Sequence, residues 1–158
     1  MISDARIIDS AVEILNAHRI MAVSTVRSDG WPQTTFVAFA NDGLDIYFLV
    51  DAKSQKAANI KLENRVSLAV GEEPQQIQYA KAVYAAALAS QVRGQKARVA
   101  AWAILSTRHP YLSDFEMPGV GKGIMIRARC RYLTVLDYAQ GLGHCDSVSL
   151  PLPPGSER

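Results

Sequence analysis

Cysteine is scarce in this chain, which has only Cys130 and Cys145 among its 158 residues. Two thiols cannot build a disulfide scaffold, and no Cys-x-x-Cys or His/Cys ligand spacing suggests a structural zinc site. We therefore expect both cysteines to be free thiols. An excess of one charge is also missing, because 17 Lys and Arg residues nearly balance 15 Asp and Glu residues. This balance argues against nucleic acid or an anionic membrane surface as the main partner.

Long hydrophobic runs are lacking as well. Uncharged runs such as residues 82–92 are too short to span a bilayer, and the acidic start of the chain is unlike a signal peptide. We therefore expect a cytoplasmic protein. The length suits one domain, over residues 1–150, which buries roughly two thirds of the surface that the unfolded chain exposes. Residues 151–158 hold two consecutive prolines and little to bury, and we expect them to form a disordered tail.

Apolar residues recur with helical spacing in some segments and form short strand-like runs in others. Ser3 is a candidate N-cap for the first helix, and the Asp-Gly pairs at 29–30 and 42–43 are typical of hairpin turns. The predicted helices are 3–18, 53–60 and 94–107. The predicted strands are 20–26, 33–39, 44–50, 66–70, 77–89 and 124–136. This order predicts a mainly β (α+β) fold, a small antiparallel barrel of about six strands with flanking helices.

Two of these segments fit more than one interpretation. The many alanines of 77–89 favour a helix, whereas its β-branched and aromatic residues and its place after a run of strands favour the strand that we predict. In the last strand, alternation places Arg127, Arg129 and Arg131 on one face. Either this face meets an anionic substrate or a partner chain, or it is a solvated face with acidic neighbours, which we favour.

The start of the second predicted helix is the most informative stretch for function. Ser54, Gln55 and Lys56 follow directly after a strand. A helix N-terminus presents unpaired N–H groups and a partial positive charge, so a phosphate placed there meets aligned donors. The Ser54 hydroxyl and the Lys56 ammonium add a donor and a full charge. The alternative is an ordinary solvated helix face.

The order of elements from about Asp9 to Tyr138 resembles the FMN-binding split-barrel family, that of pyridoxamine 5'-phosphate oxidase and related flavin-binding proteins. In that family the third strand leads into a Ser-x-Lys helix start, and the helix runs into Asn-Pro-Arg-Val before the next strand. This chain has Ser54-Gln55-Lys56 and then Glu63-Asn64-Arg65-Val66. The resemblance implies a split barrel and a homodimer that holds FMN at the interface, with each cofactor contacted by both chains.

The resemblance also implies which positions contact the cofactor. The implied cofactor-binding residues are Thr35, Phe36, Val37, Val50, Ser54, Gln55, Lys56 and Gln78, with Gln76 as the alternative to Gln78. The oxidase has arginine at the position of Thr35 and lysine near Ala40, where this chain has smaller neutral residues. That departure leaves FMN and a deazaflavin open as the cofactor.

The expected function is a flavin-dependent oxidoreductase acting on a small molecule, with an electron donor or substrate as its partner. The alternatives are a deazaflavin-dependent reductase and a non-catalytic flavin-binding or haem-binding protein. The family's oxidase carries an Arg-x-His pair near its end, and nothing comparable follows Leu136, so we do not expect vitamin B6 oxidation. The segment from Asp137 to His144 instead resembles the ending of uncharacterised relatives, and His144 either faces a ligand or caps the loop.

Overall fold

The computed structural model describes residues 2–118 and 122–151. Most of the tail that we expect to be disordered, residues 152–158, lies outside this part of the chain. The α-helices of the described residues are α1 (Asp4–Ala17), α2 (Gln55–Leu62) and α3 (Gln95–Arg108). The strands are β1 (Ile20–Val26), β2 (Pro32–Asp42), β3 (Asp45–Asp51), β4 (Arg65–Gly71), β5 (Lys81–Gln91), β6 (Gly123–Asp137) and β7 (Cys145–Ser149).

All seven strands belong to one antiparallel sheet in the order β3-β2-β1-β4-β5-β6-β7, and a further pairing of β3 with β6 closes the first six into a barrel. The predicted mainly β fold is therefore confirmed. The alanine-rich segment is a strand from Lys81 onward, preceded by a 3-10 turn at Ile77–Tyr79. Its pairing with β4 on one side and β6 on the other outweighs the helix propensity of alanine.

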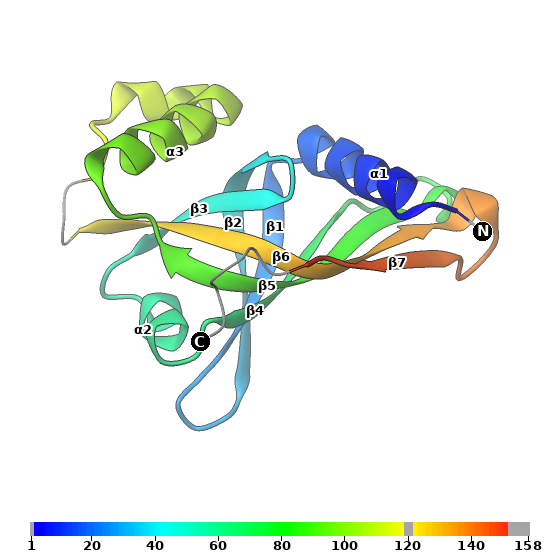
Figure 1. Cartoon of the computed structure of the whole chain (residues 1–158), viewed down its shortest axis with the longest axis horizontal. Helices are drawn as coiled ribbons and strands as arrows, with labels where there is room; N and C mark the ends of the chain where they lie inside the picture. Colours follow the sequence, from blue (N-terminus) through cyan, green and yellow to red (C-terminus); the bar gives the residue numbers. More distant parts are fainter. Residues whose placement is uncertain (1, 119–121, 152–158) are drawn as a thin grey trace.

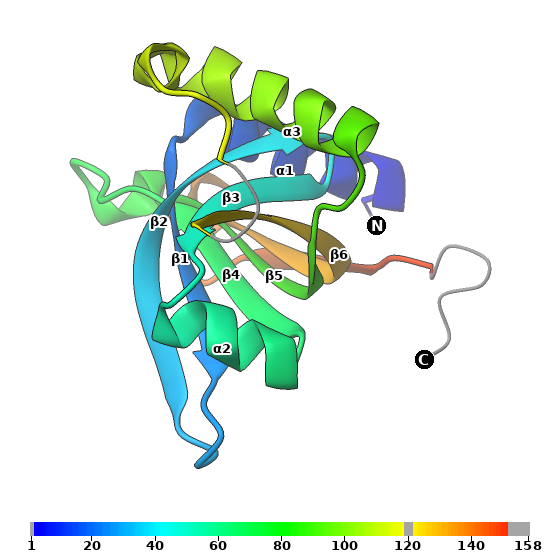
Figure 2. The same ribbon diagram turned by 90° about the vertical axis from the view of Figure 1, so that its left-hand side faces the viewer.

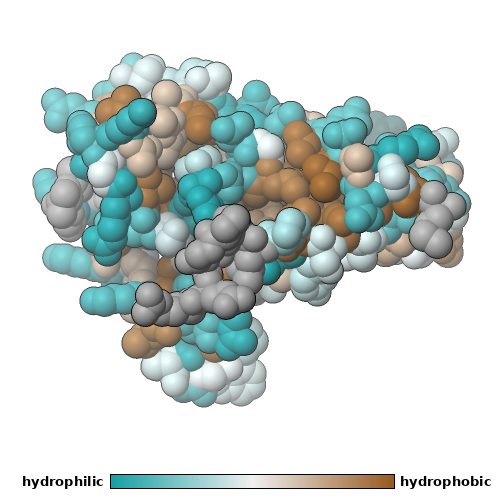
Figure 3. Space-filling model, viewed as in Figure 1, coloured by the Kyte–Doolittle hydropathy of each residue, from teal (hydrophilic) through white to brown (hydrophobic). Residues whose placement is uncertain are grey.

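The helices cover different parts of the barrel. Figure 2 shows α3 above the strands and α2 below them. The helix α1 lies alongside β5, β6 and β7 (Figure 1). In Figure 3, apolar residues gather where α1 meets the strands, and hydrophilic residues cover much of the remaining face. Ser3 occupies the N-cap position of α1, although its side chain makes no capping hydrogen bond. No helix in residues 2–118 or 122–151 is long and apolar enough to cross a membrane.

A β-bulge divides the long strand β6. Cys130 lies opposite Ala87 and Tyr132 lies opposite Ala86, so Arg131 is an extra residue on its strand. The alternation therefore changes there, and Leu133 and Val135 face the core beyond the bulge.

The face of β6 that carries Arg127 and Arg129 is partly covered by other residues. Met125, on the same face, is buried beneath α3. Arg127 forms an ion pair with Asp45, and the Arg129 Nε atom lies 3.9 Å from an oxygen of the same carboxylate. These contacts agree with a face that has acidic neighbours.

Candidate functional site

The barrel is split between β2 and β3. These strands pair only between Phe39–Asp42 and Asp45–Phe48, whereas residues 32–38 of β2 pair with β1 alone. Residues 49–51 of β3 pair with β6 alone. Backbone N–H and C=O groups therefore line both sides of an opening without a neighbouring strand, and such groups require other partners. Thr35, Phe36 and Val37 belong to one side of this opening and Val50 to the other.

Three residues separate the end of β3 from the start of α2. The Ser54 hydroxyl accepts a hydrogen bond from the Ala57 N–H at 3.2 Å and donates one to the Asp51 carbonyl at 2.7 Å. Ser54 is thus the N-cap that fixes the start of the helix. Its hydroxyl group is engaged within the chain, so the first turn of α2 offers a ligand mainly backbone N–H groups and Lys56.

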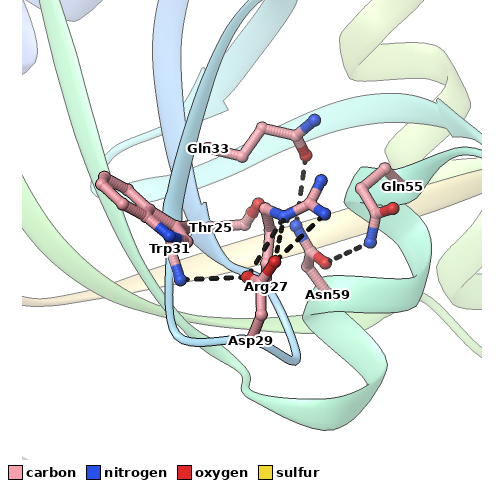
Figure 4. Close-up of polar contacts among 7 residues, drawn as sticks. All are labelled: Thr25, Arg27, Asp29, Trp31, Gln33, Gln55 and Asn59. Carbon is pink, nitrogen blue, oxygen red and sulfur yellow. Dashed lines mark hydrogen bonds and ion pairs between the residues drawn. The ribbon is translucent and has the colours of Figure 1, made fainter.

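A partly buried polar network ties α2 to the β1–β2 hairpin (Figure 4). Asn59, which is fully buried, donates from Nδ2 to Thr25 Oγ1 at 2.9 Å and to Gln33 Oε1 at 3.1 Å. The Asn59 Oδ1 atom accepts from Gln55 Nε2 at 2.7 Å. Because Gln55 and Asn59 lie one helical turn apart, they form one flank of α2 that faces the hairpin. The network therefore holds the helix at a fixed position beside the split.

Lys56 lies on the side of α2 that faces the barrel. It precedes Asn59 and Ile60 by three and four residues, and both of those side chains are buried. Burial lowers the pKa of the Lys56 ammonium. Within residues 2–118 and 122–151, no carboxylate lies within ion-pair distance of Lys56 and no hydrogen-bond partner faces its side chain. A partly buried cation without a counter-ion favours binding of an anion.

Thr35 carries a second unpaired group close to the network. It lies opposite Val23 on the inner face of β2, two residues from Gln33 on the same face. The Thr35 Oγ1 atom is buried, and no described residue is its hydrogen-bond partner. The orphaned hydroxyl thus belongs to the strand that carries Gln33, the unpaired ammonium belongs to the helix that carries Asn59, and a hydrogen bond joins Gln33 to Asn59. Together the hydroxyl and the ammonium fit an anionic group that accepts hydrogen bonds, such as a phosphate.

The remaining predicted residues lie in different surroundings. Val37 and Val50 are buried in the barrel core, so only their backbone groups are free to meet a ligand. Phe36 points outward and is 80% exposed. Gln78 is exposed in the 3-10 turn before β5, where it bonds to Gln76. That turn and α2 lie at opposite ends of β4 and β5, so the structure separates Gln78 from the other predicted positions within one chain.

His144 lies in the loop before β7. Its Nε2 atom is 2.8 Å from an Asp146 carboxylate oxygen, and its carbonyl accepts from the Asp137 N–H at 3.1 Å. Since Asp137 pairs with Lys81 at the start of β5, this loop lies at the end of β5 away from α2. The contacts match the loop-capping alternative for His144.

Sequence reasoning missed the three residues that anchor α2, namely Thr25, Gln33 and Asn59. They are polar residues on one helix and two strands, and 26 to 34 positions separate Asn59 from its partners. Nothing in their local sequence distinguishes them from exposed polar residues. Only the pairing of β1 with β2 and the position of α2 bring them together.

Comparisons with known proteins agree with this fold. The family model described as pyridoxamine 5'-phosphate oxidase matches residues 7–120. No curated protein sequence matches the chain. A conserved hypothetical protein from Mycobacterium tuberculosis is 23% identical with a TM-score of 0.71, and the match covers 99% of this chain and 96% of that protein.

Two further solved structures are similar in fold. The haem storage protein HutZ from Vibrio cholerae has 18% identity and a TM-score of 0.64 over 82% of this chain and 91% of its own. A haem-binding protein from Mycobacterium smegmatis has 16% identity and a TM-score of 0.75 over 94% of this chain, which spans only 59% of that protein's length. These identities establish the fold alone, whereas the family model covers most of the chain. This chain, a split barrel with α2 beside the gap, therefore belongs to the pyridoxamine 5'-phosphate oxidase family.

Proposed function

We propose that this chain binds FMN at the split between β2 and β3 and acts as a flavin-dependent oxidoreductase on a small molecule. The main support for the proposal is that Lys56 is a partly buried cation without an acidic partner among the described residues. A phosphate monoester held at the first turn of α2 would supply that partner, and the helix N–H groups would add aligned donors.

Other parts of the split have complementary roles in this proposal. The Thr35 hydroxyl would donate to the phosphate or to the chain that connects it with the ring. The unpaired backbone groups at residues 32–38 of β2 would contact the polar edge of the ring. When bound, FMN supplies a centre that accepts or gives a hydride, and backbone donors near the ring favour its reduced anionic form. No side chain of the protein needs to act as an acid or a base.

We also propose that a second copy completes the site. The outer face of the sheet carries two rows of neighbouring residues without a charged side chain. The rows are Phe36, Ala22, Ala69, Tyr84 and Thr134, and beside them Thr34, Ser24, Ser67, Ala86 and Tyr132. The three aromatic side chains of these rows are exposed by 46 to 80%. An uncharged face with exposed aromatic residues is typical of the centre of a protein interface, which supports a homodimer.

Haem binding is the alternative, because two relatives of similar fold are described as haem-binding and haem storage proteins. Haem iron in proteins takes an axial ligand from His, Cys, Met or Tyr. The side chains grouped around α2 are Thr25, Gln33, Thr35, Gln55, Lys56 and Asn59, and none of them is of these types. The polar groups at the split therefore suit a phosphate better than an iron porphyrin.

Titration of the purified protein with FMN tests the proposal, with absorption and quenching of flavin fluorescence as readouts. We expect Lys56→Gln to weaken FMN binding by about tenfold or more, because a charge-assisted hydrogen bond contributes about 1.5 to 3 kcal/mol. Lys96→Gln, at an exposed lysine in the first turn of α3, is the matched control. The proposal would be overturned if the protein did not bind FMN but bound haemin and gave the absorption shift of a ligated iron.

Turnover is tested separately on the FMN-loaded protein. We expect a reduced nicotinamide dinucleotide to bleach the flavin absorption under anaerobic conditions. If FMN binds tightly and neither nicotinamide dinucleotides nor other two-electron donors reduce it, the chain is a flavin-binding module and not an oxidoreductase. Parallel titration with a deazaflavin decides between the two cofactors.

A further inference from the structure

A second hollow lies on the other flank of α2, away from the network of Gln55 and Asn59. It has a volume of about 630 Å³. Ser54, Ala57, Ala58 and Lys61 line it, and their spacing of three and four residues places them on one side of the helix. The C-terminal end of β5 and the start of β6 form the opposite wall. Neither Lys56 nor Thr35 lines this hollow, which we call the α2–β5 groove.

The floor of the α2–β5 groove is apolar. Ile60 and Ile126 lie almost fully buried in it, and Ile124 is half-buried beside them. The alanines of α2 and β5 leave room above this floor. Among the described lining residues there is no aromatic side chain, so the groove offers no platform for stacking a base or another flat ring.

The rim of the groove is cationic. Lys53, Lys61 and Arg93 line it, and no described lining residue is a carboxylate. In residues 2–118 and 122–151, none of these three cations takes part in an ion pair. Three unpaired cations above an aliphatic floor would repel a metal ion or an amine and attract an anion.

We propose that the α2–β5 groove binds an aliphatic carboxylate of medium chain length. The hydrocarbon chain would lie on the isoleucine floor, where it removes apolar surface from water, and the carboxylate would meet the ammonium and guanidinium groups at the rim. The volume lies within the usual range for small-molecule sites. This site is distinct from the proposed FMN site because neither Lys56 nor Thr35 lines it, although Ser54, the N-cap of α2, borders both.

Calorimetric titration of the full chain with sodium octanoate tests this inference. Octanol supplies the same hydrocarbon chain without charge, and acetate supplies the charge without the chain. We expect octanoate to bind about tenfold more tightly than either, since both the floor and the rim contribute. Equal affinity for octanol and octanoate, or the absence of octanoate binding, would overturn the inference.

Substitutions in the α2–β5 groove test whether octanoate binds there. Lys61→Gln combined with Arg93→Gln is expected to weaken octanoate binding by about five- to tenfold, because two partly screened charges are removed. Ala58→Phe, at an exposed helix position that lines the groove, is expected to block octanoate without unfolding the protein. Lys96→Gln, outside the groove, serves as the control. Unchanged octanoate binding in both groove variants would refute the assignment.

The two proposals can fail separately. FMN titration of the Lys61/Arg93 double variant should give the affinity of the unmodified chain, whereas Lys56→Gln should leave octanoate binding unchanged. If the double variant loses FMN and retains octanoate, the groove is the flavin site and the carboxylate inference is wrong.

Discussion

Asn59 on α2 and Thr25 on β1 are joined by a hydrogen bond of 2.9 Å although 34 residues separate them in the chain. Both side chains are buried. The same amide group of Asn59 also reaches Gln33, so a single side chain connects the helix with both strands of the hairpin.

Asn59→Leu should therefore destabilise the protein. The substitution keeps a similar volume but leaves Thr25 and Gln33 without their donor, and an unsatisfied buried polar group costs about 1 to 3 kcal/mol. Urea unfolding followed by circular dichroism measures the loss. Asn64→Leu, at an exposed position, is the control, and equal midpoints for the two variants would show that the network adds no stability.

Thr35→Val should act in the opposite direction on the ligand-free protein. The hydroxyl is buried without a partner among the described residues, so its removal should raise the free energy of unfolding by about 1 kcal/mol. If that hydroxyl contacts FMN, affinity should fall by about fivefold in the same variant. Thr34→Val provides the comparison, because the Thr34 hydroxyl already bonds to Ser24 on the outer face. A Thr35 variant that is both less stable and unaffected in FMN binding contradicts the assignment.

Phe36→Glu should disrupt the proposed homodimer. A carboxylate at this position would be buried in the middle of an uncharged interface without a partner. Light scattering after size-exclusion chromatography should show a dimer for the unmodified chain and a monomer for the variant. Val99→Glu, at an exposed site on α3, should remain dimeric. A monomeric unmodified chain would count against the dimer and against a flavin site shared by two subunits.

The two thiols should react differently. Burial, assisted by the nearby Asp45 carboxylate, raises the pKa of Cys130 to about 12, whereas Cys145 is exposed. At pH 8, dithionitrobenzoate should modify the exposed Cys145 quickly and the half-buried Cys130 much more slowly. Since the folded pKa of Cys130 lies above its ordinary value of 9.0, its contribution to stability is present below pH 9 and lost as pH rises toward 12. Rapid modification of both thiols in the folded protein would contradict this account.

The elements were largely predictable because their signals are local. The Asp-Gly turns and the alternating runs located β1 to β6 to within a few residues, and the helix start at Ser54 was also found. The strand β7 was missed, since Cys145–Ser149 buries only Val148 and forms because β6 is long enough to pair with it beyond the barrel. The sequence could not show that Arg131 is a bulge, because a bulge depends on the partner strand.

The candidate site was predictable only in part. Lys56 was identified from its position at a helix start after a strand. Its most informative property, burial without an acidic partner, depends on how α2 docks against the barrel. The anchoring residues Gln33 and Asn59 were not found, because a polar residue becomes part of a network only when distant segments meet.

Strand β2 changes its pairing partner along its length, which affects how easily its hydrogen bonds open locally. No residue of β2 is paired on both sides: residues 32–38 pair with β1, and Phe39–Asp42 pair with β3. In contrast, β5 is paired on both sides over most of its length. Amide protons of β2 should therefore exchange with solvent through low-energy fluctuations, while those of β5 should require global unfolding. The strand on this side of the split can therefore open locally while the rest of the barrel stays paired. FMN bound at the split should slow amide exchange in β2 and in the first turn of α2, and leave exchange in β5 unchanged.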